Sequence, residues 1–219
     1  MIVTGARGCV YCLGNAILRP DQILVRSRSS YVVAPRGQLA GGFLAAAPYS
    51  CVSSLSRLEP DTLRDLALQL SLIVDFYRNE GHESVTLYEQ GRGGAGATRD
   101  PKDGFPLHAH LCAVAGSVNL DARLRTEGVI VELAKLAELP LAVKGRAYVL
   151  AVTSEPSGVR LRAYVASNPE QARQLESLRL RVWIAGELGS PRRAHWRNEP
   201  ADDELESLVG RFRDYLATS

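Results

Sequence analysis

The sequence lacks the features that mark several large classes of protein. No apolar run approaches the roughly 18 residues of a membrane span, and the segment MIVTGARGCV has no apolar core of a secretory signal peptide. Only three lysines occur (Lys102, Lys135 and Lys144), and the arginines are scattered, so the net charge of +2 does not indicate a nucleic-acid surface. We therefore expect a cytoplasmic protein that binds neither a membrane nor nucleic acid.

What is present is the composition of an ordinary globular protein. Its 219 residues are 46% hydrophobic and 23% charged, which suits one large domain or a domain with an extension. Helical spacing is clearest between Pro60 and Gly81, and the alternation of apolar residues indicates several short strands. The expected helices are 59–82, 124–139, 169–189 and 202–217, and the expected strands lie within 22–35, 41–48, 84–90, 105–114, 146–153 and 159–167. This mixed order predicts an α+β fold.

The segment FPLHAHLCAV, residues 105–114, places two histidines and a cysteine at alternating positions. In a strand, alternate side chains share a face, so His108, His110 and Cys112 are expected on one surface. The intervening apolar side chains, Leu107, Ala109, Leu111 and Ala113, are then expected to face the core. Two histidines satisfied by neighbours at a strand edge are the plain alternative.

Cys9 and Cys12 form a CxxC pair in the segment CVYC. In a cytoplasmic protein such a pair indicates a metal site or a redox centre in preference to a structural disulfide. A redox pair is expected at the start of a helix, whereas Gly14 and Asn15 favour a turn here. Metal binding is therefore the better interpretation, but two thiols supply only half of a tetrahedral site.

With these motifs the chain resembles the histidine triad (HIT) superfamily, whose signature strand reads His-x-His-x-His and is followed by two apolar residues. The matching segments are HAHLCAV, the CxxC pair, GFLAAAPYSC at Gly42–Cys51, the long helix and the glycine-rich loop 91–104. The likeness covers residues 9 to about 115, and LRVWIAGELGSPRRAHWR is similar to a C-terminal segment of some members. It implies a HIT-like antiparallel sheet with packed helices and a C-terminal helical extension. Residues 1–125 would form the HIT-like domain with a zinc knuckle, and residues 126–219 a hairpin and helices on the same core.

The resemblance supplies the missing half of the metal site. Zinc-containing relatives bind the ion through the CxxC pair, the histidine that ends the turn after the third strand, and the first histidine of the triad; here Cys51 stands in place of the turn histidine. Carried over, these ligands are Cys9, Cys12, Cys51 and His108, a donor set common in structural zinc sites. The implied zinc is structural.

The resemblance also implies covalent chemistry at the middle histidine, His110. Its imidazole would attack the α-phosphorus of a nucleotide or nucleotide sugar and form a nucleotidyl-histidine that an acceptor then resolves. Glycines of the 91–104 loop would let backbone N–H groups bind phosphate, and basic side chains would neutralise its charge. The expected substrate-binding residues are Arg92, Gly93, Gly94, Arg99, Lys102 and Gly104; the alternative for this loop is a solvated connection.

Cys112 is the departure from the family pattern. Hydrolases carry histidine at this position and the phosphorylase and uridylyltransferase branches carry glutamine, whereas a thiol is a weak hydrogen-bond donor. We therefore expect a nucleotidyltransferase or phosphorylase acting on a nucleoside diphosphate compound, with Cys112 beside the nucleophile. A HIT-type hydrolase, a non-catalytic nucleotide-binding protein, and a metallohydrolase that uses His108 and His110 stay open, as does a homodimer.

Overall fold

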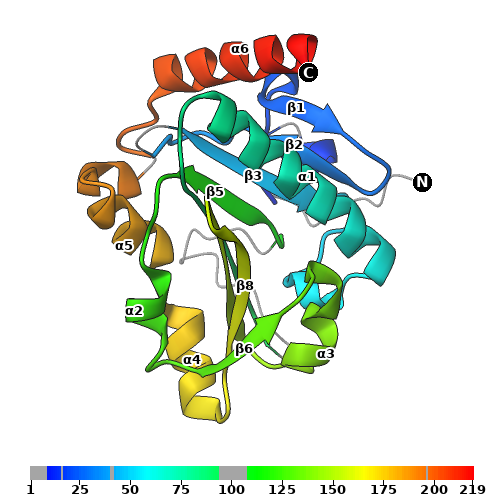
Figure 1. The fold of residues 1–219 in the computed structure, drawn as a ribbon, viewed down its shortest axis with the longest axis vertical. Helices are drawn as coiled ribbons and strands as arrows, with labels where there is room; N and C mark the ends of the chain where they lie inside the picture. The colour runs from blue at the N-terminus through cyan, green and yellow to red at the C-terminus, as the bar shows by residue number, and fades with distance from the viewer. Residues whose placement is uncertain (1–8, 16, 40–41, 94–107, 196) are drawn as a thin grey trace.

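The computed structural model describes residues 9–15, 17–39, 42–93, 108–195 and 197–219. Within these ranges eight strands form one antiparallel sheet in the order β1-β2-β3-β5-β4-β7-β8-β6 (Figure 1). The α+β prediction is confirmed. The strands are β1 Ile23–Arg26, β2 Ser30–Val33, β3 Phe43–Pro48, β4 Val85–Gly91, β5 Leu111–Ala115, β6 Val129–Leu133, β7 Tyr148–Glu155 and β8 Gly158–Val165.

Six α-helices and several short 3-10 turns accompany this sheet in the described residues. The helices are α1 Pro60–Asn79, α2 Leu120–Leu124, α3 Leu139–Val143, α4 Pro169–Ser177, α5 Leu180–Glu187 and α6 Asp202–Thr218. The 3-10 turns used below are η1 Leu13–Asn15, η3 Leu55–Arg57, η4 Leu136–Glu138 and η5 Pro191–Ala194. None of these helices is long and apolar enough to cross a membrane.

One face of the sheet is covered by α1, which runs across β2 and β3 in Figure 1. Its apolar stripe is fully buried, as the spacing predicted, and packs on inward-facing leucines such as Leu44 and Leu111. Helix α6 extends this core, because the Phe212 ring lies 4.7 Å from the ring of Phe76. Gly81 follows α1 with φ +86°, a conformation that glycine adopts without strain.

The opposite face carries a second core. Tyr88, Cys112 and Val114 point to this side and are covered by apolar residues of α2, α4 and α5, including Leu175 and Ile184. Cys112 pairs with Ala45 of β3 and Tyr88 of β4, so it sits near the middle of the sheet. The C-terminal half therefore closes over the surface on which the His-x-His-x-Cys residues were expected.

The predicted helix at 124–139 is wrong. Its middle forms the edge strand β6, in which the β-branched run Val129-Ile130-Val131 pairs with β8. Leu133, Leu136 and Leu139 have helical spacing, but only the 3-10 turn η4 and the short helix α3 follow this spacing. Branched side chains favour a strand when a free sheet edge lies beside them, and here that tertiary context overrides local spacing.

The other predicted elements differ in their limits. The helix expected at 169–189 is divided into α4 and α5, because Leu178 has an extended backbone with φ −60° and ψ 129°. The hairpin of β7 and β8 is confirmed, and it closes at Gly158 with φ +133°. Strand β5 begins at Leu111, so His108 and His110 lie in the segment leading into it. Because β4 pairs with β7, residues 1–125 and 126–219 contribute to the same sheet.

Candidate functional site

The four side chains expected to bind metal come together from three separate segments. Cys9 and Cys12 lie just before η1, Cys51 follows β3, and His108 precedes β5. Their ligand atoms all lie within 4.8 Å of one another. The Sγ atoms of Cys9 and Cys12 are each 3.5 Å from His108 Nδ1, and the Sγ atoms of Cys9 and Cys51 are 4.0 Å apart.

The orientation of His108 suits a ligand. Its Nε2 lies 2.8 Å from the carbonyl oxygen of Pro48, and a carbonyl can only accept, so Nε2 carries the proton. Nδ1 is then the unprotonated nitrogen, and it faces the sulfur atoms. A ligating histidine fixed through its other ring nitrogen is the usual arrangement in metal sites.

The spacing of the donors also suits a metal such as zinc. With metal–sulfur bonds of about 2.3 Å and metal–nitrogen bonds of about 2.0 Å, the edges of a tetrahedron are about 3.5–3.8 Å long. The observed 3.5 and 4.0 Å separations are close to these values. Burial raises the pKa of the Cys9 and Cys12 thiols, and a divalent cation would offset this effect by stabilising the thiolates. The cluster could therefore hold a metal ion with three sulfur donors and one nitrogen donor.

The imidazole of His110 is held in one tautomer beside this cluster. Its Nδ1 lies 2.7 Å from the backbone carbonyl of His108, so Nδ1 donates and Nε2 keeps its lone pair. Burial lowers the pKa of His110 to about 4, which keeps the imidazole neutral at physiological pH. The backbone is pinned as well, because the Ala109 N–H donates to the Val52 carbonyl at 2.6 Å. His110 therefore has the neutral, oriented imidazole that a nitrogen nucleophile needs.

Cys112 lies on the same side of the sheet but in a different environment. It is only 5% exposed, and it packs with Phe43 and Tyr88 in the second core. Burial raises the pKa of its thiol to about 12, while Tyr88 and the cation of Arg181 oppose this shift. At neutral pH the group is therefore a protonated thiol inside the protein.

Of the expected substrate-binding residues, the structure describes Arg92 and Gly93. The Gly93 N–H donates to the carboxylate of Glu176 at 3.1 Å. This N–H, which was expected to bind phosphate, is therefore already hydrogen-bonded to a side chain of the protein. A Cβ at Gly93 would lie 2.6 Å from the backbone nitrogen of Ala147, so only glycine fits. The remaining candidates, Gly94, Arg99, Lys102 and Gly104, lie outside the described residues, as does Leu107.

Two further residues contact this region and were not identified from the sequence. Tyr11, inside the CxxC pair, stacks on the imidazole of His110 with ring centroids 4.3 Å apart. Arg181 of α5 places its guanidinium 4.9 Å from the centroid of the Phe43 ring and donates to three backbone carbonyls. The position of Tyr11 between two candidate ligands was a usable signal, whereas nothing in the local sequence distinguished Arg181 from the other arginines.

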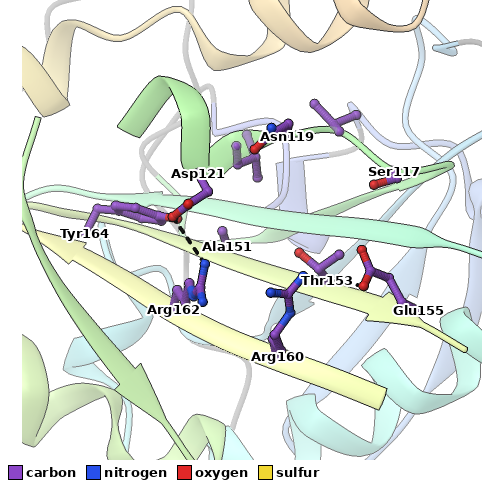
Figure 2. Close-up of a pocket in the computed structure, with 11 residues that line it drawn as sticks. Ser117, Asn119, Asp121, Ala151, Thr153, Glu155, Arg160, Arg162 and Tyr164 are labelled. Atoms are coloured by element: carbon purple, nitrogen blue, oxygen red, sulfur yellow. Dashed lines mark hydrogen bonds and ion pairs between the residues drawn. The ribbon is translucent and has the colours of Figure 1, made fainter. Parts of the chain in front are cut away.

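A shallow depression of about 260 Å³ lies elsewhere, on β7, β8 and the segment 117–121 (Figure 2). Its charged side chains are already paired, with Arg162 3.2 Å from Asp121 and Arg160 3.4 Å from Glu155. The Tyr164 hydroxyl also donates to Asp121 at 2.7 Å. None of the residues expected at the catalytic or metal site lines this depression.

Comparisons with known proteins identify no family and no activity for this chain. No protein-family model matches the chain, and no curated protein matches it. Among solved structures, the chain is similar to a DUF4931 family protein from Bacillus cereus, with 13% sequence identity and a TM-score of 0.42. That likeness covers 75% of this chain and 98% of the other. The functional assignment therefore depends on the residues described above.

Proposed function

We propose that the protein is a HIT-like nucleotidyltransferase or phosphorylase that acts on a nucleotide sugar or dinucleoside polyphosphate through His110. The observation that carries the proposal is the hydrogen bond from His110 Nδ1–H to the His108 carbonyl, which leaves Nε2 unprotonated. The neighbouring cluster of Cys9, Cys12, Cys51 and His108 supports the proposal, because the HIT-like motifs predict a zinc site at these four residues. A zinc ion there would be structural and would supply no step of the reaction.

In the first step the Nε2 lone pair attacks the α-phosphorus of the substrate. The new P–N bond forms as the bond from phosphorus to the bridging oxygen breaks, and the leaving phosphate takes that electron pair. His110 becomes positively charged, and the Nδ1–H donated to the His108 carbonyl stabilises the charge. Arg92 and the predicted basic residues Arg99 and Lys102 would neutralise charge on the phosphoryl oxygens.

In the second step an oxygen of the acceptor attacks the same phosphorus and the P–N bond breaks, which restores the neutral imidazole. The acceptor's proton, where it carries one, passes to solvent. Cys112 cannot act as a base or as a charged ligand here, because its buried thiol stays protonated. This favours an acceptor that is already anionic, such as phosphate or a sugar phosphate, over water.

The test is to trap the intermediate. The protein is incubated with a panel of α-labelled nucleotides, dinucleoside polyphosphates and nucleotide sugars, and then examined for acid-labile label. His110→Ala is expected to abolish labelling and to lower turnover by several orders of magnitude, with metal content and nucleotide affinity retained.

The matched control is His195→Ala, because His195 is exposed and lies in the C-terminal extension. Label that survives in His110→Ala, or turnover near the wild-type rate, would contradict the proposal. Absence of labelling in the wild-type protein across the whole panel would favour the second candidate.

That second candidate is a nucleotide-binding protein without turnover. The occupied Gly93 N–H favours it, since a phosphate must first displace the Glu176 carboxylate. By contrast, no contact favours a metallohydrolase in which His108 and His110 share a catalytic metal, because His108 Nδ1 already faces the Cys9 and Cys12 sulfur atoms. His110 is also absent from the set of side chains that come together as possible ligands in the described residues.

A further inference from the structure

Tyr11 joins the cysteine cluster to His110. Its ring is only 5% exposed and lies nearly parallel to the imidazole of His110, with an interplanar angle of 25° and centroids 4.3 Å apart. The same ring approaches His108 at 6.0 Å in a tilted arrangement. The backbone is held too, because the carbonyl of Tyr11 accepts a hydrogen bond from the buried hydroxyl of Tyr31.

These contacts restrict both the direction in which the edges of the His110 ring point and the plane of that ring. The hydrogen bond from Nδ1 to the His108 carbonyl fixes which edge of the ring points to the backbone. The stack with Tyr11 fixes the plane of the ring, and because the contact is face-on, the Tyr11 ring does not itself cover the Nε2 edge. An aliphatic side chain of similar volume would fill the space without setting the plane.

Both contacts involve the segments that carry the candidate metal ligands. Tyr11 lies between Cys9 and Cys12, and the carbonyl that receives Nδ1–H belongs to His108. Ordering of the four candidate ligands therefore orders the ring above His110 and the acceptor beside it. Without that order, the described contacts that hold the segment around Tyr11 are the Tyr31 hydrogen bond, the hydrogen bond from the Asn15 amide to the Cys9 carbonyl, local turn hydrogen bonds and packing.

We propose that Tyr11 is a positioning residue for His110, and that metal binding at the Cys9, Cys12, Cys51 and His108 cluster fixes the imidazole through it. The catalytic consequence rests on the function proposed above, but the positioning does not. Since small displacements of a reacting group slow chemistry sharply, loss of the stack should lower the rate of nucleotidyl transfer about 10- to 100-fold. The KM should change little, because Tyr11 is assigned no contact with substrate.

The experiment follows His110 by NMR in protein labelled at histidine with ¹³C and ¹⁵N and loaded with zinc. In the wild-type protein we expect upfield ring-current shifts of the imidazole protons, cross-relaxation with the Tyr11 ring, and a single Nδ1–H tautomer. Removal of the metal with a chelator should erase all three. Their absence from the zinc-loaded wild-type protein would overturn the proposal, whichever variants fold.

Two variants separate positioning from packing. Tyr11→Phe keeps the ring and should keep the shifts and tautomer, whereas Tyr11→Leu should lose the shifts and mix the tautomers. Val10→Ala, a change in the same knuckle, is the matched control and should resemble wild type at equal zinc content. A Tyr11→Leu protein with zinc bound and an unchanged His110 spectrum would overturn the proposal. If no substrate is ever turned over, the NMR result stands and only the proposed function fails.

Discussion

At the scale of single residues, burial gives neighbouring groups different chemistry. His108, His110 and Cys112 alternate along one segment, yet the first faces three sulfur atoms, the second stacks on Tyr11, and the third is a protonated thiol in the core. Residue type alone predicted three reactive groups on a surface. The sequence predicted one strand face for all three, but β5 begins only at Leu111, so His108 and His110 precede it. The coverage of Cys112 by α4 and α5 comes from residues far along the chain, which local patterns do not encode.

Glu89 is a second residue whose state is set by burial. It is 3% exposed, its Oε1 accepts the Leu55 N–H at 3.0 Å, and its Oε2 has no hydrogen-bond partner in the described part of the chain. Burial raises its pKa to about 7, although the Tyr148 hydroxyl and the Leu55 N–H oppose the shift. The folded protein therefore binds this proton more tightly than the unfolded chain does.

This predicts a specific dependence of stability on pH. Between the ordinary glutamate pKa and about 7, the unfolded chain has released the proton and the folded protein has not, so stability falls as pH rises through this window. The loss amounts to about 3 kcal/mol, and Glu89→Gln should remove it because the amide is neutral at every pH. Urea unfolding of both proteins across this range measures the difference.

The control for that measurement is Glu170→Gln, which alters an exposed carboxylate at the start of α4. It should leave the pH dependence of the wild-type protein in place. Identical slopes for the wild-type protein and Glu89→Gln would show that Glu89 ionises normally in the fold.

At the scale of elements, the four candidate metal ligands come from three segments of the chain, and none of the four lies in a paired strand. Cys9 and Cys12 lie just before η1, Cys51 lies in the turn after β3, and His108 lies just before β5. The sequence predicted this set because a CxxC pair is recognisable locally and the family likeness supplied the rest. Tyr11 was missed because its role depends on a stack across nearly 100 residues of chain.

Loss of a thiol from this cluster should therefore weaken the whole fold. Cys9→Ser or Cys51→Ser is expected to reduce bound metal below one equivalent and to destabilise the protein by about 4 kcal/mol or more. Elemental analysis and thermal unfolding with and without a chelator measure both effects.

Cys112→Ser serves as the comparison, since it changes a buried cysteine outside the cluster. Its metal content should remain that of the wild-type protein even though a buried hydroxyl lowers stability somewhat. Full metal in Cys9→Ser and Cys51→Ser, or none in the wild-type protein, would rule out the site.

The same scale shows where sequence patterns failed. Helix α1 was predicted correctly because its apolar stripe, Pro60 and Gly81 all agree. Strand β6 was not, because Leu133, Leu136 and Leu139 continue a helical spacing that the structure follows only in the 3-10 turn η4 and the short helix α3. The decisive factor was the free edge of β8, and an edge exists only once the rest of the sheet is assembled.

At the scale of the whole molecule, the two halves of the chain contribute strands to one sheet. Strand β4 pairs with β5 on one side and β7 on the other, and α6 returns to pack on α1. Both tryptophans, Trp183 and Trp196, belong to the C-terminal half of the sequence, whereas three of the four candidate metal ligands come from the first 51 residues.

Unfolding should therefore be seen at one midpoint by two distant probes. Tryptophan fluorescence and metal release to a chromophoric chelator should coincide on heating. Phe212→Ala should lower both midpoints together, because a fully buried ring is lost at a cost of about 3–5 kcal/mol. Separate transitions, or a shift in fluorescence alone, would mean that the C-terminal half unfolds independently.

The distance in sequence between the cysteine pair and its histidine has a consequence for biosynthesis. Cys9 and His108 are 99 residues apart, and a ribosome adds about 5–20 residues each second, so the pair is made about 5–20 s before its last ligand. During that interval a nascent chain presents two, and later three, thiols that cannot yet form the complete cluster. The newly made chain therefore passes through a period in which its cysteines are open to oxidation or to capture of the wrong metal, and a reducing, metal-buffered compartment would protect them until His108 emerges.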